Sequence, residues 1–397
     1  MDLTFTAEEN QFRQQVRDWL HSNRPSESRP SVADLSACRE YDLAWQKTLA
    51  ESGWAGIAWP TEYGGRGLPL VQQLIWYEEY AKADMPPGGS ESVCFVGLAH
   101  AGPTLIYSGS EEQKSFHLPK IINGDAVWCQ GFSEPSAGSD LASLRTKAVI
   151  DGDDLVVNGQ KVWTSYADVA DYQELLVRTD FEAPKHKGIT WVICDMKSPG
   201  ITIRPIKNMA GNTEFCEVFY DDVRIPLKNI IGGLNNGWKT AMSTLSFERG
   251  TAFIADQVEL EVDLKALEQL AHRTKFPNEK TAISNDVIAA RLCEMKAEVN
   301  ALKAMTYMSV SKNMTQDLPG PEGSVIRLFY SKLSQRVTQL CMDVLQSEGL
   351  VLSRVPGAAN HLIEKYLFRY SATIGAGTEQ IQRSIIAERI LGLPKSR

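Results

Sequence analysis

The sequence predicts an α+β fold in which a β region lies between two helical regions. Apolar residues recur every three to four positions in the first 125 residues, alternate singly from about 126 to 232, and then return to the helical period. We therefore expect an N-terminal helical domain (1–125), a middle antiparallel, β-barrel-like domain (126–232) and a C-terminal four-helix-bundle domain (233–397). No helix pattern separates the strands and no dinucleotide fingerprint is present, which disfavours a parallel Rossmann sheet.

The composition of the 397 residues is that of an ordinary globular protein. A net charge of −8 offers no basic patch for nucleic acid, and the apolar runs are too short to cross a bilayer. The seven cysteines are scattered without a Cys-x-x-Cys pair, so we expect reduced thiols and no metal site. The first residues lack the basic and apolar regions of a secretory signal, which predicts a cytoplasmic protein without membrane insertion.

The first helix is predicted by a capping box, Thr6-Ala7-Glu8-Glu9, followed by apolar residues at helical spacing. Further helices are expected over 43–52 and 71–83, and another is expected to end near residue 124. In the C-terminal region the helical period predicts long helices over 237–273, 284–312, 322–348, 357–370 and 378–391.

Alternation of apolar and polar residues predicts the strands of the middle domain. Residues 144–150 alternate, Gly152 and its acidic neighbours predict a turn, and Asn158-Gly159 predicts a second hairpin turn. Strands are expected again over 174–178, 188–194, 201–205 and 214–220.

One charged residue shares a helix face with apolar neighbours. Glu248 lies on the stripe that contains Ala241, Leu245 and Ala252, and no cation stands three or four positions away. A buried carboxylate without a partner has a raised pKa, which suits a general base near neutral pH. The alternative is a structural Glu248 that pairs with an arginine from another helix.

Two loops are rich in small residues. Residues 132–140 start the β region, and their backbone N–H groups and hydroxyls could approach an anionic or heteroaromatic ligand; an ordinary loop is the alternative. Residues 375–383 form a glycine-rich turn that enters the last helix, where free N–H groups could bind a carbonyl oxygen or a phosphate. A plain helix cap with Thr378 as the N-cap explains the second motif equally well.

These features occur together in a known family. The sequence resembles the acyl-CoA dehydrogenases over essentially its whole length. Residues 131–140 match the family's T/S-E-P-x-A-G-S-D motif, residues 158–165 match N-G-x-K-x-W-I-T/S, and residues 377–383 match the closing G-T-x-Q-I-Q-R. The resemblance implies the helical, β, helical fold of that family, FAD as the cofactor, and the oxidation of an acyl-CoA thioester.

The resemblance also assigns residues to the cofactor. It implies that the isoalloxazine ring lies along one stretch of chain and packs against a second one, and that the pyrophosphate and the CoA portion lie near Ser139. The two flavin stretches are Gln130, Gly131, Phe132 and Ser133, and then Trp163, Thr164 and Ser165.

For the adenine half of FAD, the matching positions are Gln346, Thr378 and Gln380. Many family members add an R-T-Q-F-G motif from a neighbouring subunit, whereas the run here is Arg273-Thr274-Lys275-Phe276-Pro277. Arg273 and Phe276 are kept, but Lys and Pro replace Gln and Gly, so this end of the site could be completed by a different subunit.

The catalytic base is assigned by a departure from the commonest pattern. Ala376 stands where many members place the catalytic glutamate, and alanine cannot remove a proton. The isovaleryl-CoA branch instead carries the base on the bundle helix, in a pair that matches Glu248-Arg249. The resemblance thus implies that Glu248 removes the α-proton, that the Ala376 N–H binds the thioester carbonyl, and that flavin N5 takes the β-hydride.

The product would be a trans-2-enoyl-CoA, and Arg249 is expected to contact polar groups of the substrate. The small residues Gly375 and Ala376 favour a branched, cyclic or bulky acyl group. The implied partners are an electron-transfer flavoprotein and copies of the chain in a homotetramer or dimer of dimers, or a homologous subunit. The alternatives are a subunit that completes its partner's FAD site in a mixed tetramer, and an acyl-CoA oxidase.

Overall fold

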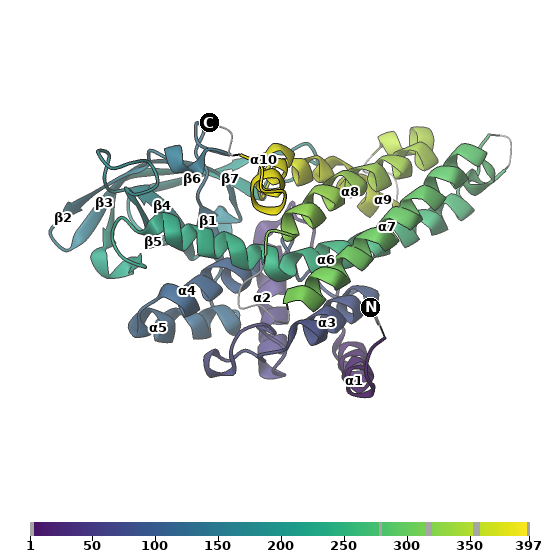
Figure 1. Cartoon of the computed structure of the whole chain (residues 1–397), viewed down its shortest axis with the longest axis horizontal. Helices are drawn as coiled ribbons and strands as arrows, with labels where there is room; N and C mark the ends of the chain where they lie inside the picture. Colours follow the sequence, from purple (N-terminus) through teal and green to yellow (C-terminus); the bar gives the residue numbers. More distant parts are fainter. Residues whose placement is uncertain (1–3, 278–279, 314–319, 352–357, 395–397) are drawn as a thin grey trace. The chain divides into compact units, whose positions relative to one another are not determined.

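The computed structural model describes residues 4–277, 280–313, 320–351 and 358–394, with the backbone alone at 246–253, 313 and 358–361. Figure 1 shows the ribbon of the whole chain, and its contacts divide it into two compact units. We call Met1–Ser22, Leu70–Asp84 and Gly250–Arg397 the helical unit. The sheet unit consists of Asn23–Pro69 and Met85–Arg249. The three expected domain ranges stay a prediction.

The sheet unit is built on a sheet with the strand order β6-β7-β3-β2-β4-β5-β8, and β1 pairs with β4. The described strands are β1 (Trp128–Gly131), β2 (Lys147–Asp151), β3 (Asp154–Ser165), β4 (Tyr172–Arg178), β5 (Ile189–Asp195), β6 (Ile201–Ile206), β7 (Phe215–Pro226) and β8 (Ile230–Ile231). Most pairs are antiparallel, as expected. The β1–β4 pair is parallel, because the chain completes the β2–β3 hairpin between these strands and returns in the same direction.

One segment that was expected to form a turn lies inside a strand. The β2–β3 hairpin turns at Gly152 as predicted, but Asn158-Gly159 lies within β3 at an irregularity of its pairing with β7. Gly159 has a φ of +150°, and a Cβ there would lie 2.8 Å from the Thr146 Cα. The Asn158 amide donates to Asp222 over 2.9 Å. The irregularity is a β-bulge whose extra residue lies in β7, because Asp221 and Asp222 together stand opposite Asn158, and Asp222 has a φ of +48°.

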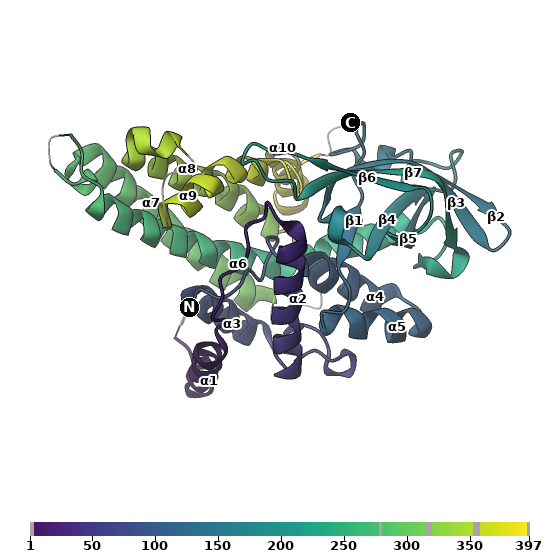
Figure 2. The ribbon, with the colours of Figure 1, turned by 180° about the vertical axis from the view of Figure 1, so that it is seen from behind.

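Helices accompany the sheet. Within the sheet unit these are α2 (Leu35–Glu51), α4 (Gly102–Ser108) and α5 (Glu111–Ile122), and α4 and α5 lie side by side in Figures 1 and 2. The helix α2 begins well before the expected residue 43, because the Asp34 carboxylate caps it by accepting the Ala37 N–H at 3.0 Å. Seven buried apolar residues illustrate the core of the sheet: Val157, Leu175, Val177, Val192, Cys194, Val218 and Val223.

The helical unit contains α1, α3 and the bundle. Its described helices are α1 (Ala7–Asn23), α3 (Leu70–Lys82), α6 (Gly237–Arg273, continuing from the sheet unit), α7 (Asp286–Asn313), α8 (Gly323–Leu345), α9 (Ala358–Phe368) and α10 (Glu379–Ile385). The predicted capping box is confirmed, since Thr6 N–H donates to Glu9 at 2.7 Å and Glu9 N–H donates to the Thr6 hydroxyl at 3.2 Å. Among the described residues, no helix has the length and apolar character needed to cross a membrane.

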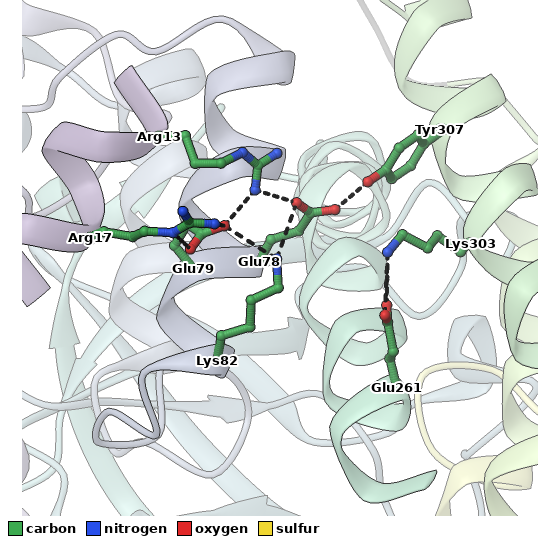
Figure 3. A network of polar contacts seen from close by, with 8 residues as sticks. All are labelled: Arg13, Arg17, Glu78, Glu79, Lys82, Glu261, Lys303 and Tyr307. Carbon is green, nitrogen blue, oxygen red and sulfur yellow. Dashed lines mark hydrogen bonds and ion pairs between the residues drawn. The ribbon is translucent and has the colours of Figure 1, made fainter. Parts of the chain in front are cut away.

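A network of charged side chains joins α1, α3 and α7 in the helical unit (Figure 3). Glu78 and Glu79 on α3 are almost completely buried, and Arg13 on α1 contacts both carboxylates, at 2.7 and 2.5 Å. Tyr307 on α7 donates its hydroxyl to Glu78. Four further residues in the figure complete its ion pairs around α3 and between α6 and α7: Arg17, Lys82, Lys303 and Glu261. These contacts fix the two N-terminal helices of this unit to the bundle.

Candidate functional site

The first expected flavin stretch continues β1 into a buried segment. Gly131 is buried, and a Cβ at this position would lie 2.6 Å from the Gln173 amide, so a larger residue would force that amide to move. Phe132 is buried and the Ser133 side chain is partly exposed. The Gln130 amide donates to the buried Glu174 carboxylate at 2.7 Å. The backbone of this stretch is therefore held close to the sheet interior.

A fully buried ion pair holds the end of this stretch. The Lys161 ammonium donates to the Phe132 carbonyl at 3.0 Å and to the Glu134 carboxylate at 2.8 Å. Glu134 also accepts the N–H groups of Arg145 and Thr146. Burial lowers the pKa of Lys161 to about 8. Burial alone would raise the pKa of Glu134, but Lys161 and the N–H donors hold it below its ordinary value, so both groups are ionised at pH 7.

The second expected flavin stretch contains a break in the β3–β7 pairing. The pairing shifts register between Lys161 and Thr164, and Trp163 there has a φ of +61°. The bulge leaves the Trp163 indole 59% exposed, while Thr164 is completely buried and Ser165 is partly exposed. Among the residues that the structure describes, the Thr164 hydroxyl has no hydrogen-bond partner. An exposed ring beside an unsatisfied buried hydroxyl fits a heteroaromatic ligand with polar atoms.

The turn that contains Ser139 is exposed. Asp140 next to it forms an ion pair with Lys185 at 2.9 Å. Hydrogen bonding to Ser143, with Lys185 as a further cause, lowers the pKa of Asp140. Ser139 thus lies on an exposed turn that the ion pair between Asp140 and Lys185 stabilises.

The glycine-rich turn of the helical unit has an unusual backbone. Ala376 has a φ of +52° and Gly377 a φ of +90°. A non-glycine residue in this region costs about 1–2 kcal/mol, a strain that in proteins clusters at functional sites. Within the described part of the chain, the Ala376 N–H has no hydrogen-bond acceptor. Thr378 caps α10 by accepting the Ile381 N–H at 3.3 Å, so the cap that the sequence allowed is present.

The remaining residues expected at the adenine half are at helix ends in the helical unit. Gln346 follows α8, is exposed, and has a φ of +52°. Gln380 is exposed in the first turn of α10. Arg273 is the last, exposed residue of α6. Phe276 is partly buried and packs against the core of this unit.

Glu248 and Arg249 belong to α6 by their backbone. Their side chains lie outside the described residues, so the expected inward direction of Glu248 stays a prediction. Gly375 lies in the exposed turn, and the nearest atom to a Cβ built on it is the Ser371 carbonyl oxygen at 3.6 Å. An added methyl group at Gly375 would meet only ordinary contacts there.

Comparison with known proteins identifies the family of this chain. Models of the N-terminal, middle and C-terminal domains of acyl-CoA dehydrogenase match residues 6–125, 129–223 and 235–391. The chain belongs to the acyl-CoA dehydrogenases. It is therefore an oxidoreductase that uses FAD, and the expected fold class is confirmed.

Individual relatives cover the chain from end to end. Acyl-CoA dehydrogenase IpdE1 of Mycobacterium tuberculosis is 37% identical over 390 residues, 97% of this chain and 98% of its own. The ChsE4-ChsE5 complex of Mycobacterium tuberculosis contains a chain with a TM-score of 0.85 and 32% identity, with complete coverage of both chains. The Tcur3481-Tcur3483 steroid ACAD gives a TM-score of 0.86 and 29% identity, again with complete coverage.

Four residues that support the acyl-CoA dehydrogenase motifs were not predicted as site residues. Glu134 and Lys161 occur inside the motifs, and the alternation along β3 places Lys161 on the same inward face as Val157, which was an available signal. Gln382 also lies in a motif, and its amide donates to the Ala376 and Gly377 carbonyls. Arg327 on α8 donates to the Gly375 carbonyl, and no local pattern signals that contact.

Proposed function

We propose that this acyl-CoA dehydrogenase removes the α-proton of a bulky acyl-CoA with Glu248 and binds the thioester carbonyl with the Ala376 N–H. The observation that carries the proposal is the turn at Ala376. Its side chain has no titratable group, yet its backbone is held in a strained conformation with an N–H that has no acceptor among the described residues. Such a fixed N–H stabilises an oxyanion, and the base must then come from another residue.

Glu248 is the candidate for that base. It lies on α6 next to Arg249, in the pair by which one branch of the family carries its catalytic glutamate. A carboxylate takes the α-proton more easily when the enolate oxygen is stabilised at the same time, so Glu248 and the Ala376 N–H would act together. Arg249 would contact polar groups of the CoA thioester.

The residues present fit FAD. The exposed Trp163 ring and the unsatisfied Thr164 hydroxyl suit the isoalloxazine. Further contacts with the same ring would come from Gln130, Phe132 and Ser133. When bound, FAD supplies a hydride acceptor at N5. The adenine half would be held by Gln346, Thr378 and Gln380, and the pyrophosphate by the turn at Ser139. The proposed electron acceptor of the enzyme is an electron-transfer flavoprotein.

The proposed substrate class is a branched, cyclic or steroid-ring acyl group. At Gly375 and Ala376 the closing turn has no side chain larger than a methyl group. One structural relative is described as a steroid ACAD. The Gly375→Ala variant tests this. Because its new methyl group meets only ordinary contacts within the turn, it should fold normally but lose bulky substrates more than straight-chain ones.

A panel of acyl-CoA thioesters without oxygen tests the reaction. The panel contains butyryl-, octanoyl-, isovaleryl- and cyclohexanecarbonyl-CoA and a CoA thioester of a steroid with a short carboxylic side chain. Bleaching of the flavin by the bulky members, and its loss in Glu248→Gln, would support the proposal. Glu261→Gln is the matched control, since Glu261 stands on the same helix in an ion pair with Lys303. Bleaching of Glu248→Gln at the unmodified rate would exclude Glu248 as the base.

A mixed assembly is the second candidate function. The run Arg273–Pro277 departs from the family motif, and Phe276 packs into the chain's own core. One structural relative is the ChsE4-ChsE5 complex, and another carries two protein names, Tcur3481-Tcur3483. We therefore propose a tetramer that is either made of this chain alone or mixed with a homologous subunit. A purified chain that is yellow and tetrameric by itself would exclude the need for a partner. A colourless chain that gains flavin only on co-expression would support the mixed form.

A further inference from the structure

The closing turn of the helical unit is held by two side chains that have no assigned role. The Arg327 guanidinium on α8 donates to the Gly375 carbonyl at 3.2 Å. The Gln382 amide on α10 donates to the carbonyls of Ala376 and Gly377 at 3.1 and 3.3 Å. Three successive carbonyls are thus bound from two helices. A strained backbone persists only where its surroundings fix it, and these contacts do so.

The contact of Arg327 acts directly on the N–H of Ala376. The Gly375 carbonyl and the Ala376 N–H belong to the same planar peptide group and point in opposite directions. A donor that fixes the carbonyl therefore fixes the direction of the N–H. Because the donor is a cation, its hydrogen bond also polarises the peptide group and makes the N–H a stronger donor.

Both supporting side chains are themselves held in place. The Arg327 side chain is only 12% exposed, and it contacts Asp256 at 3.5 Å and stacks near the Tyr330 ring. Gln382 is 2% exposed. Further support comes from Ser371, whose carbonyl accepts the Gly375 N–H at 2.8 Å. The turn is therefore organised within the helical unit before any ligand binds.

We propose that Arg327 and Gln382 are positioning residues that aim and polarise the Ala376 N–H for the carbonyl oxygen of the acyl-CoA thioester. The inference rests on the proposed function, in which this N–H binds that oxygen. Neither residue touches the substrate; each acts through the peptide groups of residues 375–377.

Four variants separate this role from a general effect on folding. Arg327→Met removes the donor to the Gly375 carbonyl and keeps the aliphatic length. Gln382→Leu removes the donor to the next two carbonyls. Arg336→Met is the matched control, because Arg336 stands on the same helix and pairs with Glu298 of α7 at 2.6 Å. The conservative Arg327→Lys variant keeps the charge and one donor.

The first measurement needs no substrate. Hydrogen exchange of the peptide that covers residues 371–378 should be about tenfold faster in Arg327→Met and Gln382→Leu, because the turn opens more often. Exchange in Arg336→Met should equal that of the unmodified chain. Unchanged exchange in both test variants would overturn the proposal.

The second measurement is the rate of flavin bleaching in a single turnover with the panel thioester that reacts fastest with the unmodified chain. Arg327→Met should be at least about tenfold slower while FAD content and thioester affinity stay near the unmodified values, since a weakened oxyanion donor acts on the transition state. Arg327→Lys should recover part of the rate. An equal loss in Arg336→Met, or a loss confined to affinity, would contradict the inference.

The two proposals fail in different ways. If Glu248→Gln bleaches normally, the assigned base is wrong whatever Arg327→Met does. If Glu248→Gln is inactive and Arg327→Met reacts at the unmodified rate, the base stands and the positioning role is refuted. If no thioester bleaches the flavin, the exchange measurement still decides whether Arg327 and Gln382 hold the turn.

Discussion

The two segments assigned to the active site are held in opposite ways. In the sheet unit, Phe132 and Glu134 are held from inside the core by Lys161, a charged residue with no exposed surface. In the helical unit, the turn at Ala376 is exposed and is held by side chains that reach it from α8 and α10. Loss of Lys161 leaves a buried carboxylate without its cation, whereas loss of Arg327 or Gln382 leaves carbonyls of an exposed turn that water can reach. Substitutions should therefore affect stability in the first segment and rate in the second.

The largest effect is expected for Lys161→Met. The substitution leaves the Glu134 carboxylate buried without its cation, which typically costs about 3–5 kcal/mol. The free energy of unfolding, measured with urea, should fall by about that amount, and FAD content should fall with it because the Phe132 carbonyl loses its donor. A loss below about 1 kcal/mol, the size found for surface pairs, would refute this account.

The double variant Lys161→Met, Glu134→Gln is the control. It removes both charges, so it should recover much of the lost stability even though the Phe132 carbonyl remains without its donor. If FAD content recovers with stability, the ion pair serves the fold alone. If stability returns and FAD content does not, the bond to Phe132 positions the flavin stretch.

A second prediction uses a titratable group in the same unit. Burial, with Lys120 as a minor cause, lowers the pKa of His117 to about 4, and its ring packs edge-on against Trp128 and Tyr172. The folded state then binds fewer protons than the unfolded state between pH 4 and 6.5. The contribution of neutral His117 to stability is complete above pH 6.5 and is lost as the pH falls toward 4, by about 3 kcal/mol.

The variant His117→Phe keeps the ring contacts and removes the titration. Urea unfolding of the two proteins at several pH values should give curves that diverge between pH 6.5 and 4, with the unmodified chain losing more stability. Parallel curves would mean that His117 takes up its proton without unfolding the sheet unit. No such acid sensitivity is expected from the turn at Ala376, which contains no titratable side chain.

A smaller effect is expected at the N-cap of α10. Thr378→Ala removes the acceptor of the Ile381 N–H and should lower the free energy of unfolding by about 1 kcal/mol. Thr378→Ser keeps a hydroxyl and should lose much less. If Thr378 also touches the adenine half of FAD, Thr378→Ala will weaken FAD binding, measured by flavin release during dialysis. Unchanged FAD binding would leave Thr378 as a cap only.

Local patterns predicted most of the helices. The bounds of α6 agree with the expected 237–273, and the Thr6 capping box forms as the sequence indicates, because both depend on residues within a few positions of each other. Asn158-Gly159 was assigned wrongly as a turn because Gly159, with its positive φ, also suits a strand position beside the bulge in β7. The choice between them depends on the pairing of β3 with β7, which no local pattern contains.

The residues of the candidate site show the same difference between local and distant signals. Motifs predict the residues around Ser133, Trp163 and Thr378 because the family's chemistry fixes short runs of sequence. Arg327 stands 48 positions before Gly375, and only the packing of α8 against the closing turn brings them together. A single arginine on a long helix resembles any surface cation in the sequence. Supports that come from distant elements therefore have to be read from the structure.

The smallest effect on stability, and the sharpest test of the comparison, is expected for Ala376→Gly. Glycine adopts a φ of +52° without strain, which favours the folded state, but its freer unfolded chain offsets most of that gain. The free energy of unfolding should change by less than about 0.5 kcal/mol. The rate of flavin bleaching should still fall, because the turn gains other conformations in which the N–H points away from the thioester carbonyl. A slower reaction at unchanged stability would mean that the surface turn is tuned for rate. A stability loss as large as that of Lys161→Met would mean that both segments are held for the fold, and the distinction between them would fail.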